Sequence, residues 1–188
     1  MKRGFLTSIL VLLLMVPIYS AASFSVSFTG NYLSPADTNF KDTYGSGVFF
    51  PEVKLNYKVF NNISVWAGFG LLSANGETPG LGEEAKSTQN IISFGLGYSG
   101  DFTPKLGYKA EAGAAYFSYK EEAMGVEISD SAIGFRADVG IIYNITGTFF
   151  AEITAGYLSA GDTLTVFGED VDIDLGGFKA GIGVGIRF

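Results

Sequence analysis

The sequence predicts an all-β fold, an eight-stranded antiparallel up-and-down β-barrel that crosses a membrane. Apolar residues alternate with polar or small residues in strand-length runs along most of the chain. Short and long connections between these runs alternate. No stretch after residue 22 is long enough for a transmembrane helix. A chain of this composition that spans lipid must therefore do so with strands that satisfy their backbone groups in a closed barrel.

The first 22 residues have the composition of a secretory signal peptide. Lys2 and Arg3 precede an almost wholly apolar run over residues 5–18, and the small residues Ser20-Ala21-Ala22 follow. We expect cleavage after Ala22, which leaves a barrel domain over residues 23–188. The alternative is a membrane anchor helix, but the apolar run is shorter than the ~20 residues that span a bilayer.

Each of the eight expected strands has one uncharged face. The strands are expected at 24–33, 47–59, 63–73, 88–99, 105–119, 131–143, 149–160 and 175–188. The expected lipid-facing residues of the first seven strands are, in strand order, Phe24, Val26, Phe28 and Tyr32; Val53, Leu55 and Tyr57; Val65, Ala67, Phe69 and Leu71; Phe94, Leu96 and Tyr98; Leu106, Tyr108, Ala110, Ala112 and Ala114; Phe135, Ala137, Val139, Ile141 and Tyr143; Ala151, Ile153, Ala155 and Tyr157. Side chains two residues apart share a face of a strand, so these residues form one apolar belt.

The connections place both ends of the domain on one side of the membrane. Short turns are expected at 60–62, 100–104 and 144–147, and long loops at 34–46, 73–87, 120–130 and 161–174. The last loop still alternates, so we expect a hairpin that extends past the membrane and turns near Phe167-Gly168. Short periplasmic turns and long outer loops are typical of bacterial outer-membrane barrels.

The last strand carries the expected assembly signal. Its alternate apolar positions are Phe178, Ile182, Val184, Ile186 and Phe188. It resembles the C-terminal recognition strand of outer-membrane β-barrels. The whole domain resembles the small eight-stranded family of the OmpA membrane domain, OmpX and the opacity-type barrels, with OmpW as a neighbour. The resemblance implies a monomer in the bacterial outer membrane, in contact with lipid and lipopolysaccharide, inserted by the barrel assembly machinery and without a cofactor.

The opposite parity collects charged residues in the middle of the strands. Four acids and four bases are expected inside, namely Glu52, Lys54, Lys109, Glu111, Arg136, Asp138, Glu152 and Lys179. A buried charge persists when it is paired and hydrogen-bonded, and eight-stranded barrels have interiors that side chains can fill. We expect an ion-pair plug; a proton or ion relay is the functional alternative. Inward glycines leave room for these chains and for Trp66.

Apolar residues share the inward parity toward the long-loop end. The expected mouth contains Phe50, Phe117, Leu158, Leu164, Val166, Val171 and Ile173. One interpretation is a self-filled cap above the charged interior. The other is a pocket for a small hydrophobic molecule, as in OmpW-like barrels.

The expected outer loops are strongly acidic. The whole chain has a net charge of −7, and the domain after residue 22, with ten basic and nineteen acidic residues, has −9. The long loops contain fourteen of these acids and three lysines. Such a surface repels nucleic acid and heparin-like polyanions. The acids of the run Asp170–Asp174 are either a solvated face or ligands for divalent cations.

The sequence contains neither histidine nor cysteine. Ser-His and Asp-His mechanisms, disulfides and thiolate metal sites are thereby excluded. Two function hypotheses remain ahead of an enzyme. The first is a non-enzymatic surface barrel for envelope integrity or adhesion, and the second is a binder or conduit for small hydrophobic molecules.

Overall fold

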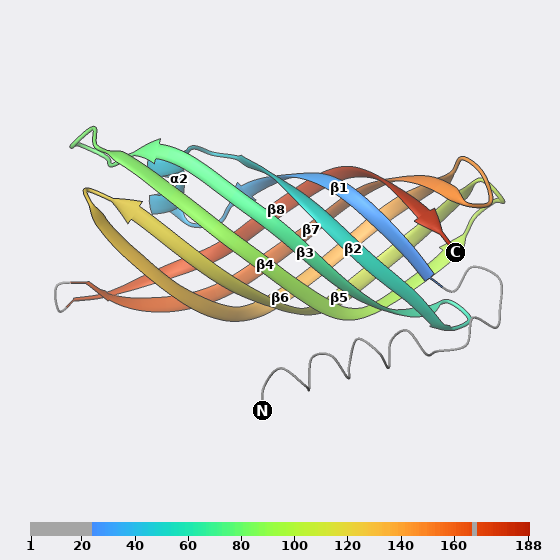
Figure 1. The fold of residues 1–188 in the computed structure, drawn as a ribbon. Coiled ribbons are helices and arrows are strands. Elements are labelled where there is room, and N and C mark those ends of the chain that lie inside the picture. The colour runs from blue at the N-terminus through green and yellow to red at the C-terminus, as the bar shows by residue number, and fades with distance from the viewer. Residues whose placement is uncertain (1–23, 167–168) are drawn as a thin grey trace, which may run out of the picture.

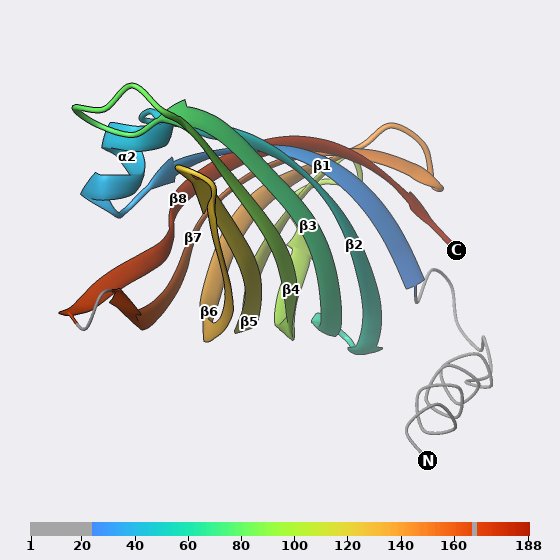
Figure 2. The same ribbon diagram turned by 60° about the vertical axis from the view of Figure 1, so that its left-hand side comes forward.

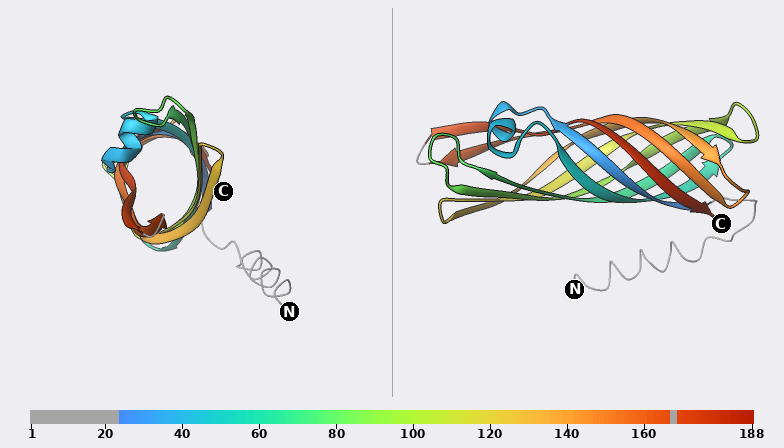
Figure 3. Two further views of the ribbon diagram at one scale, coloured as in Figure 1. Left: turned by 90° about the vertical axis from the view of Figure 1, so that its left-hand side faces the viewer. Right: turned by 90° about the horizontal axis from the view of Figure 1, so that it is seen from above.

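The chain forms a closed barrel in which each strand pairs with the next and β8 returns to β1 (Figures 1 and 3). The structure is a computed structural model that describes residues 24–166 and 169–188. Every pair of neighbouring strands is antiparallel. The strands are β1 Phe24–Pro35, β2 Val48–Phe60, β3 Ile63–Glu77, β4 Glu84–Asp101, β5 Leu106–Ala123, β6 Val126–Asn144, β7 Phe149–Val166 and β8 Glu169–Arg187. The predicted fold class and strand order are confirmed.

Burial alternates along the strands as the sequence predicted. Large apolar residues such as Phe28, Ile153 and Phe178 are exposed on the outer wall, and their neighbours in sequence are mostly buried. The outer wall over the middle of the barrel is therefore an apolar belt suited to lipid. Within the described residues, no helix is long and apolar enough to cross a membrane.

The outer connections differ from the expected long loops. The β3–β4 ladder continues to Glu77 opposite Glu84, and β5 and β6 meet in a tight turn at Met124-Gly125. Both turn residues have positive φ, 52° and 74°, as the two central residues of a tight β-hairpin turn often do. Much of 73–87 and 120–130 is thus strand. A pair of strands that extends beyond the lipid needs no apolar outer face. The alternation of apolar and polar residues is therefore lost there, although the backbone hydrogen bonds between the strands continue.

The expected loop 34–46 contains a short helix, α2 (Thr38–Tyr44), which packs beside the barrel mouth (Figure 2). Asp37 caps it by accepting a hydrogen bond from the Phe40 backbone N–H at 3.1 Å. Phe40 and Tyr44 lie one turn apart and pack against the buried apolar residues of the mouth. The helix therefore exists because it covers part of the barrel opening.

The expected hairpin of the last two strands is confirmed as far as the structure describes it. The β7–β8 ladder continues to Val166 opposite Glu169. The turn at Phe167-Gly168 and the expected signal peptide, residues 1–22, lie outside the described residues.

Four strands continue beyond the barrel as one sheet. The β2–β3 ladder ends with Glu52 opposite Gly70, and the β6–β7 ladder ends with Phe135 opposite Ser159. Between these two limits β3, β4, β5 and β6 remain paired to their outer tips. The outer end is consequently split into this four-stranded extension and the separate β7–β8 hairpin.

Candidate functional site

The structure places all eight expected charged residues inside the barrel, where each is at most 8 % exposed. Strands β2, β5, β6, β7 and β8 contribute them. We call these eight residues the charged network: Glu52, Lys54, Lys109, Glu111, Arg136, Asp138, Glu152 and Lys179.

Arg136 is the centre of the network. Its two terminal nitrogens contact both carboxylate oxygens of Glu52, one of them at 3.0 Å, and its Nε donates to Asp138 Oδ2 at 2.6 Å. Lys179 Nζ lies 3.0 Å from Asp138 Oδ1 and 3.7 Å from Glu52 Oε2. Two acids and two bases thus share one buried cluster, in which the two-oxygen contact with Glu52 fixes the guanidinium plane.

The remaining pairs lie nearer the short-turn end of the barrel. Lys54 Nζ is 2.5 Å from Glu111 Oε2, and Lys109 Nζ is 2.7 Å from Glu152 Oε2. Lys109 also approaches Glu111 at 3.8 Å, and Lys54 approaches Asp138 at 3.7 Å. These contacts join all eight charges into one network.

Neutral polar residues complete the network, and the sequence did not single them out. Thr29 donates to Glu152 at 3.1 Å, Asn31 donates to Glu52 at 3.3 Å, and Ser93 accepts from the guanidinium at 3.0 Å. Alternation in the sequence places these three side chains on the inward face of their strands. It does not predict which charged residue lies opposite each of them inside the barrel. Glu152 and Glu52 thereby accept further hydrogen bonds, which desolvated carboxylates need, and the guanidinium gains an acceptor.

A polar hollow of about 490 Å³ lies between the network and the short-turn end of the barrel. Lys54, Lys109 and Glu111 form its inner boundary, and serine, asparagine and glycine residues line its wall. The hollow therefore opens the network toward the short-turn end.

An apolar cluster lies on the other side of the network, toward the outer end. Phe50, Phe117 and Leu158 of the expected mouth are at most 1 % exposed within it, and Ile173 packs against it. The side chains of Leu164, Val166 and Val171 lie outside the described residues. We call the buried cluster the apolar cap; it consists of Leu33, Val48, Phe50, Leu72, Ala74, Ile91, Ala115, Phe117, Tyr119, Ala132, Leu158, Ala160 and Leu175.

Polar contacts tie the outer elements together around the cap. The Tyr119 hydroxyl donates to Asp162 at 2.7 Å, which links β5 to β7 across the split in the wall. The Tyr44 hydroxyl of α2 donates to Glu121 at 2.5 Å. Burial, more than these carboxylates, raises the pKa of both phenols above the usual range. Neither contact was foreseen, because each joins segments far apart in sequence.

The acidic tips are mostly solvated. Lys120 contacts Glu122 at 2.6 Å and Glu127 at 2.9 Å, but these side chains are exposed. In the described part of the chain, no group of three or more acidic side chains has an arrangement that could hold a metal ion.

The expected assembly strand lies on the outer wall. Phe178, Ile182, Val184 and Phe188 are exposed there, and Ile186 is half-buried. The Phe188 N–H donates to the Phe24 carbonyl at 2.9 Å, and the two rings are 6.0 Å apart. The end of β8 thus closes the barrel against the start of β1.

The barrel with its apolar belt agrees with a family model. Residues 8–188 match the model described as outer membrane protein beta-barrel domain. The chain belongs to this family. This outer-membrane barrel is therefore placed in the bacterial outer membrane, with the apolar belt in lipid. No curated protein matches its sequence.

Solved outer-membrane barrels share the fold. OprG from Pseudomonas aeruginosa is 14% identical with a TM-score of 0.70, covering 89% of this chain and 97% of its own. The Neisserial surface protein A is 13% identical with a TM-score of 0.66, covering 90% of this chain and 99% of its own. Ail of Yersinia pestis, in complex with the heparin analogue sucrose octasulfate, is 15% identical with a TM-score of 0.55, covering 89% and 97%. At these identities the likeness concerns the fold alone.

Proposed function

We propose that the protein is a closed, non-conducting and non-enzymatic outer-membrane barrel that acts through its outer end in envelope integrity or surface recognition. We propose export by a cleaved signal peptide over residues 1–22, insertion by the barrel assembly machinery, and a monomeric state in contact with lipid and lipopolysaccharide. The observation that carries the proposal is the filled interior, in which the apolar cap lies directly above the charged network.

The charges inside the barrel support a plug better than a pore. Each acid of the network contacts a base within 4 Å, and all eight residues are buried. A conducting path would have to separate these pairs in a low-dielectric interior, which is unfavourable. An eight-stranded barrel is only wide enough for its own side chains to fill.

Planar bilayers test the closed interior. Purified protein should show little steady conductance after insertion, with insertion verified by the heat-modifiable gel mobility of the recovered barrel. The swelling rate of liposomes that contain the protein, placed in a solution of a small sugar, gives a second measure of permeability. Large, stable currents with matching sugar uptake would refute the plug.

The outer end supports a recognition role for positively charged partners. The chain has fourteen acids and three lysines in its expected outer loops, and the four-stranded extension presents part of them beyond the membrane. Ail was solved with a polyanion. The acidic surface of this chain attracts positive charge and repels polyanions, so we expect cationic polypeptides and not sulfated sugars as partners. Divalent cations remain a further expectation at the same acids.

Binding to reconstituted protein tests this preference. Immobilised barrel should bind polylysine with an affinity that falls as salt rises, and should not bind heparin. The same measurement with Glu122→Gln and Glu127→Gln together should weaken polylysine binding. Equal binding of heparin and polylysine would contradict a role for the acidic surface.

The alternative function is a conduit for small hydrophobic molecules, which would require the apolar cap to admit a guest. A saturable binding curve for an apolar fluorophore that depends on Phe117 would favour it over the closed barrel.

A further inference from the structure

A groove of about 590 Å³ crosses the lipid-facing wall over β6, β7, β8, β1 and β2. We propose that it holds one acyl chain of a glycerophospholipid of the periplasmic leaflet, whose phosphate lies near Lys105. The residues that shape the groove are Phe28, Gly30, Phe49, Tyr143, Ala151 and Val184.

The strand register explains the hollow. One row across the four strands consists of Tyr143, Ala151, Val184 and Phe28, which are successive partners in the ladders. Ala151 is the small member of this row, and it lies between larger side chains. The adjacent row ends at Gly30, which has no side chain to fill the space.

An aromatic ring forms one wall of the groove. A Cβ atom on Gly30 would lie 2.7 Å from Phe49 Cζ, so the Phe49 ring lies over this glycine. Phe28 and Phe49 are both exposed, at 54% and 66%. Two exposed rings beside small residues form a concave apolar surface, which methylene groups can fill with close contacts.

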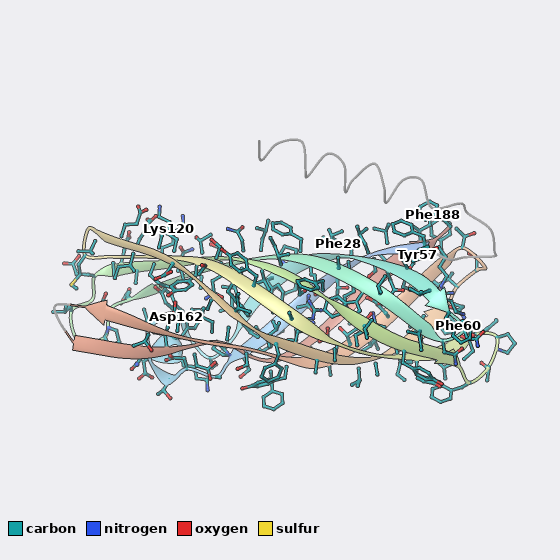
Figure 4. The ribbon with its side chains drawn as sticks, turned by 90° about the horizontal axis from the view of Figure 1, so that it is seen from below. Phe28, Tyr57, Phe60, Lys120, Asp162 and Phe188 are labelled. Carbon is teal, nitrogen blue, oxygen red and sulfur yellow. The ribbon has the colours of Figure 1, made fainter. Side chains whose placement is uncertain are left out.

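The groove runs from the periplasmic surface toward the middle of the membrane. Tyr143 precedes the last residue of β6, whereas Phe28 lies well inside β1. Phe28 is labelled between the end that carries Phe188 and the end that carries Lys120 and Asp162 (Figure 4). Strands of such barrels tilt by about 35–45°, so a row across them rises through the bilayer. An acyl chain from the periplasmic leaflet follows the same course.

The exposed residue Lys105 lies beside the end of β6 that borders the groove. The backbone N–H of Asn144, the residue after Tyr143, donates to the Lys105 carbonyl at 2.8 Å, and its side chain donates to the Pro104 carbonyl at 3.1 Å. Lys105 is exposed, and among the described side chains, those of residues 24–163 and 173–188, no carboxylate forms an ion pair with it. A lysine at this interface attracts a lipid phosphate.

The concave shape favours a flexible chain over a second copy of the barrel. A neighbouring barrel is convex, so it would contact the exposed ring of Phe49 and leave the floor at Gly30 and Ala151 empty. An acyl chain can follow the floor along its whole length, because the lining is apolar apart from Tyr143 and Glu152, and the Glu152 carboxylate pairs with Lys109 inside the barrel.

Native mass spectrometry of the reconstituted barrel tests the site. Protein from vesicles of phosphatidylglycerol and phosphatidylethanolamine should retain one phospholipid after transfer to a mild detergent. Ala151→Phe fills the groove and should reduce the retained fraction severalfold. Lys105→Gln should reduce it about fivefold, since a lysine near a lipid surface contributes about that factor in affinity.

Matched substitutions elsewhere on the barrel serve as controls. Ala112→Phe changes an exposed outer-wall alanine of β5, and Lys58→Gln changes a lysine at the end of β2; both should retain lipid as the wild type does. If Ala151→Phe fails to fold, Phe49→Ala removes a wall of the groove and should show the same loss. Equal retention by groove and control variants would overturn the proposal, as would retention of lipopolysaccharide in place of phospholipid.

Discussion

Trp66 shows how a single side chain stabilises the charged interior. Its ring lies 5.3 Å from Lys54 Nζ and 5.2 Å from the guanidinium carbon of Arg136, and its indole N–H donates to the Leu96 carbonyl at 3.0 Å. The face of an aromatic ring attracts cations most strongly where water is excluded. Alternation in the sequence placed Trp66 inside. Its two cationic neighbours follow only from the register that brings β2, β3 and β6 around the interior.

Replacing Arg136 with alanine should strongly destabilise the barrel. Glu52 and Asp138 would both lose a partner while remaining buried, which costs about 3–5 kcal/mol. Urea unfolding of vesicle-reconstituted protein, followed by tryptophan fluorescence, measures the change. Lys120→Ala is the control, because this exposed lysine should contribute less than about 1 kcal/mol. Equal effects of the two variants would contradict a tightly paired interior.

Phe117 decides whether the apolar cap packs on itself. If it does, Phe117→Ala leaves a cavity and lowers stability by about 3–5 kcal/mol without changing the uptake of an apolar fluorophore. The same urea titration gives the stability, and fluorescence titration gives the binding. Ile133→Ala, at a position 77% exposed on the outer wall, should change neither. A small stability loss combined with weakened saturable binding would indicate a guest site.

The outer ends of the strands are where sequence and structure diverge most. In the membrane, lipid on one side and a packed interior on the other impose strict alternation, so 24–33 and 63–73 were placed almost correctly. Beyond the membrane no lipid constrains the outer face of β5 and β6, and Glu121, Glu122 and Glu127 give no periodic signal. The helix α2 had a readable signature, Asp37 followed by Phe40 and Tyr44 at helical spacing. Its seven residues make about two turns, so it is too short to be stable without its packing against the cap.

Docking of α2 onto the β5 tip should weaken as pH rises. Burial raises the pKa of Glu121 and outweighs the hydrogen bonds from Ser87 and Tyr44, which lower it. The folded state therefore binds this proton more tightly than the unfolded state. Its stabilising contribution is complete below the ordinary glutamate pKa and is lost as pH rises through the raised one. Hydrogen exchange of the α2 amides, corrected for the intrinsic pH dependence of exchange, measures the docking. Protection should fall as pH rises from the ordinary glutamate pKa through the raised pKa of Glu121.

Two neighbouring variants separate this effect from general acidity. Glu121→Gln should abolish the pH dependence and keep the helix protected at neutral pH. Glu122→Gln should leave the pH dependence of α2 protection unchanged. The hydrogen bond and charge of Lys120 lower the pKa of the exposed Glu122 carboxyl, so Glu122 does not contribute a raised pKa. Identical pH profiles for wild type and Glu121→Gln would contradict the assignment.

At the scale of the whole molecule, the sequence was sufficient for closure, strand order and the two faces of the wall. Antiparallel neighbours joined by short turns leave few other topologies for eight strands in lipid. The sequence was not sufficient to predict which charged residues pair with each other inside the barrel. Arg136 contacts both Glu52 and Asp138, and choosing among four acids requires the stagger between strands that alternation alone does not provide. The lipid groove has the same origin, since Gly30 and Ala151 become neighbours of one hollow only through the register.

Closure of the barrel also predicts how it assembles. The last hydrogen bond of the β1–β8 seam runs from the Phe188 N–H to the Phe24 carbonyl, and the contact between their rings covers it. Until this seam forms, β1 and β8 are open edges, which lipid cannot satisfy. Phe188→Ala should therefore slow the appearance of the heat-modifiable form severalfold, both in vesicles and with the assembly machinery. Phe135→Ala removes a comparably exposed aromatic, paired with Tyr157 at 6.1 Å, from the middle of the wall and should assemble at the normal rate. Equal delays for both variants would mean that outer-wall aromatics act through general lipid contact and not through the seam.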